Sequence, residues 1–388
     1  MPYTQPQENF FKLFTLVYLH GTNISRQLLQ MFIDSKRFTF EAFINNHQHE
    51  LYHFSSNTLC CQCEKNTILP KKLLLDKTQM LIIFDKDSIR IDKHEQQKQG
   101  LCCLKANKNV KLDDLDLTFI RFFIVNFCCQ IFWECHLQYA KKCISVFLND
   151  NVHKVYHLAF ANVCCCKCNN DRDISHQRRI TESQFGIIFD TDGKTCHRYC
   201  SCQYRIKEGI SLSLLIDQDK KLYTEITKYF CSCQKHFEDI IAIRNEIAHA
   251  SFAFITNDEK LSKLWTATAN NILAIANVLG VNDKYEPQLL ELKEECSHSY
   301  YQKCIIDLIK TSEHFDPAIV QRIDNSTEET KFRVVMACLE EFLSSASNRN
   351  VQSVEFVKNE AVSEQHMSYY VNHIHIISRN QMGDRPQN

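Results

Sequence analysis

The chain has 388 residues, enough for about two or three domains, which excludes a single small domain. Its 7 Gly and 6 Pro are few for this length, which favours helices joined by short loops over a turn-rich sandwich or barrel. Lys and Arg total 45 against 46 for Asp and Glu, and the net charge of -1 excludes a global field that would attract nucleic acid or an anionic membrane.

The N-terminal residues and the cysteine content bear on the cellular compartment. Residues 1–14, MPYTQPQENFFKLF, lack a basic start followed by an apolar stretch and a small-residue cleavage site, so no signal peptide is expected. We therefore expect a cytoplasmic protein. In that compartment, 21 Cys favour metal ligation or buried thiols over a disulfide framework.

The first apolar helical segment spans residues 9–32 and precedes a Cys/His-rich stretch at 43–63, FINNHQHELYHFSSNTLCCQC. Next, DKTQMLIIFD at 76–85 predicts a short apolar helix with Asp76 as its N-cap. Two further cysteines, Cys102 and Cys103, follow.

The same order of features recurs further along the chain. A helical segment at 114–134 precedes FLNDNVHKVYHLAFANVCCCKC at 147–168, in which the Phe-aliphatic-Asn, His-x3-His and Cys-Cys-x-Cys groups reappear. TESQFGIIFD at 181–190 then repeats the short helix, with Thr181 as its N-cap. Such internal repetition predicts repeated structural units.

The most hydrophobic run, Leu117 to Trp133, lies in the helical segment that opens the second copy. It is shorter than about 20 residues and is interrupted by Arg121 and Asn126, which favours a buried helix over a membrane span.

A third copy begins with a helical segment at 210–230 and continues through CSCQKH, for which we expect buried thiols. RNEIAHASFAFITNDEKLSKLW at 244–265 then aligns His249 with the second histidine of each earlier His-x3-His group. On a helix, Ile240, Ile243 and Ile247 would form the buried stripe, whereas Asn245 and His249 would share a face beside Arg244. An isolated motif of this kind also fits structural use, with Arg and Asn capping or pairing within a bundle around a partly buried His.

RNEIAHA, followed by ITNDEKLSKLW and ILAIANVLG, resembles the Arg-Asn-x3-His signature of HEPN domains over residues 209–284. The resemblance is to the branch found in a DAZ-interacting RNA-binding RING ubiquitin ligase and in expanded invertebrate proteins. It implies helical bundles that often dimerise, and an RNA- or nucleotide-binding centre at Arg244, Asn245 and His249. Many members are metal-independent endoribonucleases, and the resemblance suggests a role in innate immunity or RNA control.

The motif also suits that chemistry directly. His249 would remove the proton of a ribose 2'-hydroxyl, Arg244 would neutralise charge on phosphorus, and Asn245 would hold a phosphate oxygen or orient the imidazole. At the Arg and Asn positions the first two copies carry Gln48 and His49, and Val152 and His153, so neither is expected to cut RNA. The sequence contains no phosphate-binding Walker loop, Gly-rich dinucleotide turn or His-Glu-x2-His helix, which removes several large enzyme classes.

The cysteine pairs of the first two copies predict structural Zn²⁺ sites, because zinc prefers tetrahedral sets of nitrogen and sulfur ligands. The expected ligands in the first copy are Cys61, Cys63, Cys102 and Cys103, and in the second Cys166, Cys168, Cys200 and Cys202. Mixed sites that use His53 or His157 remain open, as does the alternative of reduced, buried cysteines.

These patterns predict a mainly α protein of tandem HEPN-like bundles with small Cys/His-rich zinc-binding insertions. The expected division is 1–110, 111–208 and 209–284 for the three modules, 285–345 for C-terminal helices and 346–388 for a polar tail. We expect an RNA-binding protein, with endoribonuclease activity as one outcome. The alternative is a non-catalytic scaffold that assembles protein partners, including a second copy of itself, and no membrane partner is expected.

Overall fold

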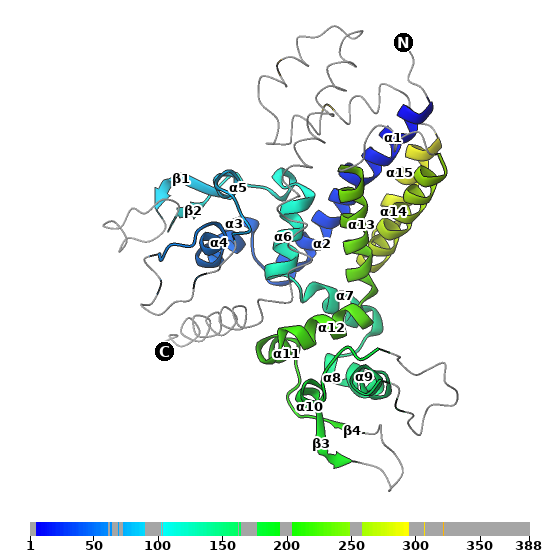
Figure 1. The fold of residues 1–388 in the computed structure, drawn as a ribbon. Coiled ribbons are helices and arrows are strands. Elements are labelled where there is room, and N and C mark those ends of the chain that lie inside the picture. The colour runs from blue at the N-terminus through cyan, green and yellow to red at the C-terminus, as the bar shows by residue number, and fades with distance from the viewer. Residues whose placement is uncertain are drawn as a thin grey trace, which may run out of the picture. The chain divides into compact units, whose positions relative to one another are not determined.

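The computed structural model describes residues 5–60, 63, 69, 73–89, 102, 104–161, 163, 177–194, 204–248, 258–294, 306 and 321. The protein is mainly helical over these residues, as predicted, with two small antiparallel sheets (Figure 1). The described residues form two compact units. The first takes those of 1–131 and those from His236 onward, and the second those of Phe132–Lys235.

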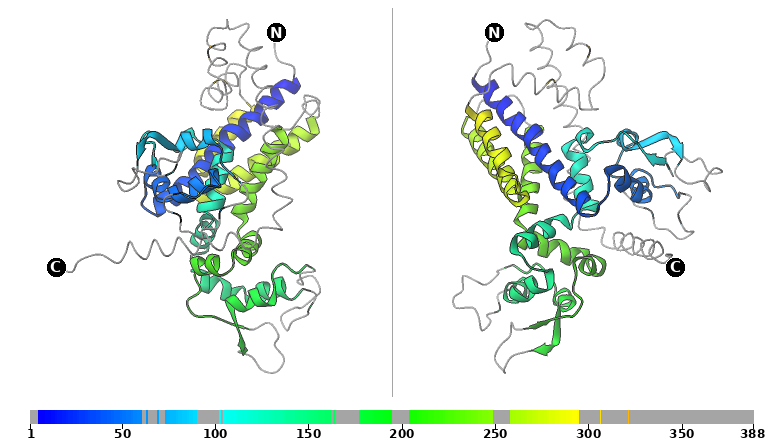
Figure 2. Two further views of the ribbon diagram at one scale, coloured as in Figure 1. Left: turned by 60° about the vertical axis from the view of Figure 1, so that its left-hand side comes forward. Right: turned by 180° about the vertical axis from the view of Figure 1, so that it is seen from behind.

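A helical bundle forms the larger part of the first unit. Its elements are α1 (Gln5–Thr15), the π-helical turn η1 (Leu16–Gly21), α2 (Thr22–Ser35), α6 (Leu117–Phe127), α13 (Ser232–Ala248, from His236 onward), α14 (Asp258–Leu279) and α15 (Asn282–Glu294). Helices α1 and η1 pack against α14, which also packs against α15, and α2 packs against α6 (Figure 2). Apolar side chains from the two ends of the described chain thus bury one another.

Two glycines explain features of this bundle. A Cβ atom on Gly21 would lie 3.1 Å from Cγ2 of Ile240, so η1 and α13 approach more closely than a larger residue would permit. Gly280 follows α14 with φ +70°, and the Val281 N–H donates to the Ala276 carbonyl, which ends the helix in a left-handed cap.

The first Cys/His repeat, residues 40–106, also belongs to the first unit. It contains α3 (Phe40–Asn46), α4 (Gln48–Ser55), α5 (Lys77–Ile83), β1 (Phe84–Ile89) and β2 (Leu104–Ala106). Its aromatic side chains pack on α6: the Phe43 ring lies 5.9 Å from that of Phe123 and 6.3 Å from that of Phe127. The repeat is therefore anchored to the bundle by an aromatic core.

The second Cys/His repeat, residues 144–206, belongs to the second unit and has the same element order. It contains α8 (Ile144–Asp150), α9 (Val152–Ala159), α10 (Glu182–Ile188), β3 (Phe189–Lys194) and β4 (Tyr204–Ile206). In both repeats the strand pair starts at a Phe and its register shifts at the corresponding place. The internal repetition read from the sequence is thus a structural one.

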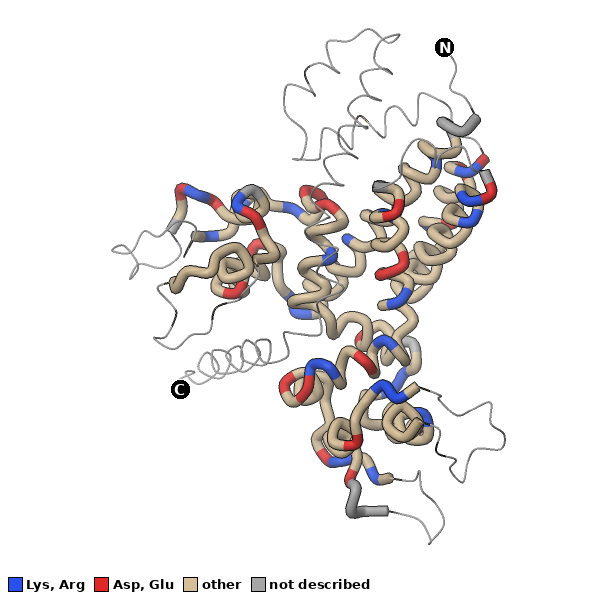
Figure 3. The backbone as a smooth tube through the Cα atoms, in the orientation of Figure 1, with Lys and Arg blue, Asp and Glu red and all other residues tan. Residues whose placement is uncertain are grey.

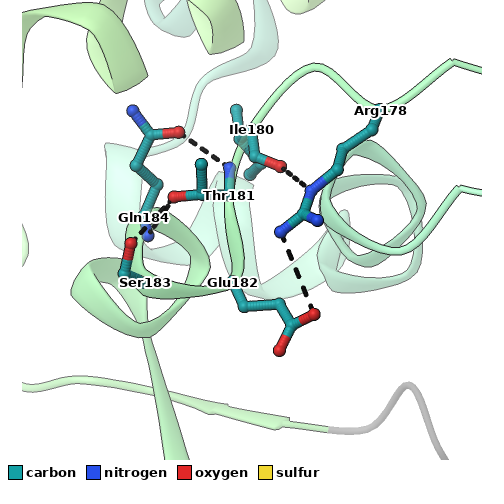
Figure 4. Close-up of polar contacts among 6 residues, drawn as sticks. All are labelled: Arg178, Ile180, Thr181, Glu182, Ser183 and Gln184. Carbon is teal, nitrogen blue, oxygen red and sulfur yellow. Dashed lines mark hydrogen bonds and ion pairs between the residues drawn. The ribbon is translucent and has the colours of Figure 1, made fainter.

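The predicted N-caps Asp76 and Thr181 are confirmed. Each side chain accepts a hydrogen bond from the backbone of the residue three positions on, and a glutamine at that position closes a capping box. Figure 4 shows the cap at Thr181. The strands that follow these helices were not predicted, because FDKDSI and FDTDGK lack the alternation of apolar and polar residues that indicates a half-buried strand.

The rest of the second unit includes α7 (Ile131–Ala140, from Phe132 onward), α11 (Leu212–Gln218), α12 (Lys220–Phe230) and the first residues of α13, up to Lys235. The predicted single helix at 210–230 is divided at Asp219, whose carboxylate caps α12 by accepting from the Leu222 N–H at 2.8 Å. Fully buried Trp133 donates from Nε1 to Oγ1 of Thr227 at 2.7 Å. Cys231 and Cys233 are buried, as predicted, and burial raises the pKa of the Cys231 thiol.

No single helix in the described part of the chain is long and apolar enough to cross a membrane. Helices α6 and α7 meet the length and composition requirement only when they are taken together, and the chain breaks between them. A short 3₁₀ turn, η3 (Leu112–Asp114), precedes α6.

Candidate metal centre and Arg-Asn helix

Helix α4 presents two histidines on one face. His49 and His53 are one helical turn apart, and their ring centroids lie 4.7 Å apart at an interplanar angle of 77°. His53 is only 1% exposed. The start of α4 is held by His47, whose ring packs 4.8 Å from the Phe43 ring and 4.7 Å from the Phe127 ring.

The chain after α4 turns back toward the histidines. The hydroxyls of Tyr52 and Thr58 share a hydrogen bond of 2.8 Å, which ties the turn to the helix. Cys60 and Cys63 then form a tight turn: the Cys63 N–H donates to the Cys60 carbonyl at 3.1 Å, and the Cys60 N–H donates to the Cys63 sulfur at 3.4 Å. A backbone N–H directed at sulfur favours the thiolate, the form that binds metal.

Four possible ligand atoms meet where this turn faces α4. Cys60 Sγ lies 3.2 Å from His49 Nδ1, and Cys63 Sγ lies 3.0 Å from His53 Nε2. The two sulfurs are 3.5 Å apart, and all four atoms lie within 4.8 Å of one another. A tetrahedral zinc ion separates its ligand atoms by roughly 3.3 to 3.8 Å, given Zn–S bonds of about 2.3 Å and Zn–N bonds of about 2.0 Å. The cluster can therefore hold a metal ion.

The cluster partly overlaps the residues predicted as ligands in the first copy. It includes Cys63 and His53, the histidine of the mixed site left open by the sequence, but Cys102 is not a member. Cys61 and Cys103 lie outside the described residues. Sequence reasoning missed His49 and Cys60, because it favoured pairing Cys-x-Cys with later cysteines. The signal that would have found them is His-x3-His followed closely by Cys-x2-Cys.

In the second copy, His157 lies on α9 and is 2% exposed. The four cysteines predicted as its zinc ligands, Cys166, Cys168, Cys200 and Cys202, lie outside the described residues.

The Arg-Asn motif lies near the end of α13. Ile240, Ile243 and Ile247 are buried, as the predicted stripe requires, while Arg244 and Asn245 are half-buried. Predicted His249 lies outside the described residues.

Arg244 interacts with Asn245 and with Tyr18 of η1. Its Nη1 donates to Oδ1 of Asn245 at 2.9 Å. Its charge also acts on the Tyr18 hydroxyl: burial raises the pKa of Tyr18 to about 12, and the Arg244 guanidinium opposes that rise. The arginine thus has an amide at its side and lies within electrostatic range of Tyr18 on η1.

No protein-family model matches the chain. No solved structure matches it. A curated relative, Non-structural protein 1 of a Rotavirus A isolate, is 25% identical over 187 residues, which cover 46% of this chain. The match spans 37% of the viral protein's length. At this identity and coverage, family membership does not follow from the similarity.

Proposed function

We propose that this protein is an RNA-binding protein of HEPN type, in which a structural zinc ion holds the first Cys/His repeat together. RNA binding is supported by the half-exposed Arg244–Asn245 pair on α13, which lies next to the buried isoleucine stripe. The structural zinc ion is supported by the cluster of His49, His53, Cys60 and Cys63.

Zinc is the ion that best suits this donor set. Thiolates and imidazoles favour zinc, whereas calcium and magnesium take oxygen ligands. Four protein ligands would complete a tetrahedral sphere and leave no open position for a reacting water, which supports a structural role. Elemental analysis of anaerobically purified protein tests this. A folded, metal-free sample would contradict the zinc assignment.

RNA contact would be local on this molecule. Lys and Arg are interspersed with Asp and Glu along the described elements of both units, in keeping with the net charge of -1 (Figure 3). A guanidinium held by a neighbouring amide retains further N–H donors that can reach a phosphate in a bidentate geometry. Binding that depends on few phosphate contacts should show a shallow salt dependence.

Fluorescence anisotropy with labelled single-stranded RNA tests the proposed binding site. Arg244→Ala should weaken RNA binding about tenfold, equivalent to ~1.4 kcal/mol, because a charge-assisted phosphate contact is lost. It should also reduce the salt slope by about 1. Lys235→Ala removes an exposed positive charge from the same helix and serves as the matched control. Equal affinities for wild type, Arg244→Ala and Lys235→Ala would contradict RNA binding at this motif.

The same preparations decide whether bound RNA is cut. Incubation with RNA in EDTA, comparing wild type with His249→Ala, detects metal-independent cleavage that needs the imidazole. Cleavage by wild type that is lost in His249→Ala would extend the function to an endoribonuclease. Binding without cleavage would define a non-catalytic RNA-binding protein.

A scaffold remains the second candidate, and one observation favours it. The Arg244 guanidinium opposes the rise that burial causes in the pKa of Tyr18, and it donates a hydrogen bond to Asn245. Both interactions lie within the bundle, which fits a structural role for Arg244. A scaffold predicts that Arg244→Ala lowers the Tm, that wild type binds no RNA, and that the protein assembles with protein partners.

A further inference from the structure

The two Cys/His repeats share backbone contacts residue by residue. In each, the carbonyl near the end of the His-bearing helix accepts hydrogen bonds from two consecutive N–H groups just before the capped helix. The corresponding bonds are those from Leu74 and Leu75 to Phe54, and from Arg179 and Ile180 to Leu158. The described residues on either side of the connection therefore meet at equivalent points in both repeats.

The histidines of α9 repeat the arrangement on α4. The rings of His153 and His157 lie 4.7 Å apart at 84°, against 4.7 Å and 77° for His49 and His53. The Tyr156 ring lies 5.3 Å from that of His157, matching a separation of 5.1 Å in the first repeat. The second histidine is buried in both repeats, 2% exposed here and 1% there.

A comparison of the α4 and α9 sequences shows which residues are identical in the two repeats. QHELYHFS of α4 and VHKVYHLA of α9 have the same residue at only three positions, the two histidines and the tyrosine between them. Packing alone requires apolar residues on the buried face, and it tolerates changes such as Leu to Val or Phe to Leu. A His pair kept while its neighbours change indicates a chemical role.

Cysteines follow both helices in the chain. Cys60-x2-Cys63 comes after α4, and Cys165-x2-Cys168 has the same spacing after α9, with one more residue in the connection. Cys165 and Cys168 lie outside the described residues, whereas the histidine pair and its framework are described.

We propose that His153 and His157 are ligands of a second metal ion, a zinc ion held by the second Cys/His repeat. This inference rests on the zinc assignment proposed for the first repeat and adds a separate site with its own ligands. Among the alternatives left open by the sequence, it favours a site that uses His157, and it adds His153. Neutral imidazoles spaced one helical turn apart present two nitrogens to one ion, as in other helix-based zinc sites.

Metal content of the full chain, measured by elemental analysis and by Co²⁺ titration, tests the proposal. Wild type should hold two ions. The His153→Asn/His157→Asn variant should hold one, and so should His49→Asn/His53→Asn. His136→Asn, which removes another histidine of the second unit, should keep two. The experiment separates the two assignments. If wild type holds one ion and only the His49→Asn/His53→Asn variant loses it, the second site is overturned and the first is supported.

A second variant covers the case in which loss of both imidazoles prevents folding. His157→Cys supplies a thiolate at the same position, so it should retain two ions and strengthen the sulfur-to-cobalt absorption of the Co²⁺ protein. Two ions with an unchanged Co²⁺ spectrum would show that residue 157 is not a ligand and would overturn the proposal.

Discussion

Nε2 of His53 lies 3.0 Å from Sγ of Cys63, although the two residues are ten positions apart in the chain. The contact closes the turn after α4 on the helix face that carries both histidines. Because a metal ion at this point would link the helix to the turn, the stability of the first repeat should depend on the ion.

Cys63→Ser should remove one zinc ion per chain and lower the Tm of the first unit, because a hydroxyl cannot replace a thiolate as ligand. Elemental analysis and thermal unfolding measure both effects. Cys102→Ser is the matched control, since Cys102 does not belong to the cluster. Retention of zinc in Cys63→Ser would contradict the cluster, whereas loss of zinc in both variants would favour the ligand set predicted from the cysteine pairs, which contains Cys63 and Cys102.

His20 should make the first unit sensitive to mild acid. Its side chain is 4% exposed, neither ring nitrogen has a hydrogen-bond partner among the described residues, and burial lowers the pKa of His20 to about 4. The His20 side chain therefore binds a proton near pH 6.5 in the unfolded chain, but only near pH 4 in the folded state. This contribution to stability is complete above pH 6.5 and is lost progressively as the pH falls toward 4.

When the pH falls from 7 to 5, the titration of His20 should lower the free energy of unfolding by about 2 kcal/mol. Urea unfolding of wild type and of His20→Phe at both values measures it, and the difference between the two proteins isolates this residue from other histidines. An equal pH dependence in both would show that His20 titrates normally.

Trp133→Phe should destabilise the second unit by about 2 to 4 kcal/mol, because it leaves a cavity and removes the hydrogen bond to Thr227. Trp265→Phe on α14 is the control, since that side chain is half-exposed and should cost less. Denaturant unfolding monitored by circular dichroism compares them. A larger loss for Trp265→Phe would contradict this account of the core.

Thr181→Ala should cost about 1 kcal/mol, since the N-cap of α10 loses the hydrogen bond to the Gln184 N–H. Arg178→Ala removes an exposed ion pair with Glu182, separated by 3.9 Å, together with the hydrogen bond from Arg178 Nε to the Ile180 carbonyl at 3.1 Å, and should cost less than the loss of the cap. Figure 4 shows both contacts side by side. Equal losses in urea unfolding would mean that the cap contributes no more than the surface pair.

Local pattern alone identified several helical segments, the repeat and the caps. The spacing of Ile240, Ile243 and Ile247 predicted a buried stripe, and the Asp76 and Thr181 positions predicted helix starts, because periodicity and capping act within a few residues. The division of the apolar run near Cys128 was not visible in the same way, since apolar composition does not reveal where a buried helix ends.

Only the tertiary structure decided which side chains meet. The choice of His49 and Cys60 over Cys102 depends on the path of the turn after α4, and the packing of α14 against α1 and η1 joins opposite ends of the described chain. A sequence shows that a helix face is apolar or that a cysteine is available. Its partner across space is selected by the combined packing of all the elements, and metal ligation, which acts over only a few ångströms, depends directly on that selection.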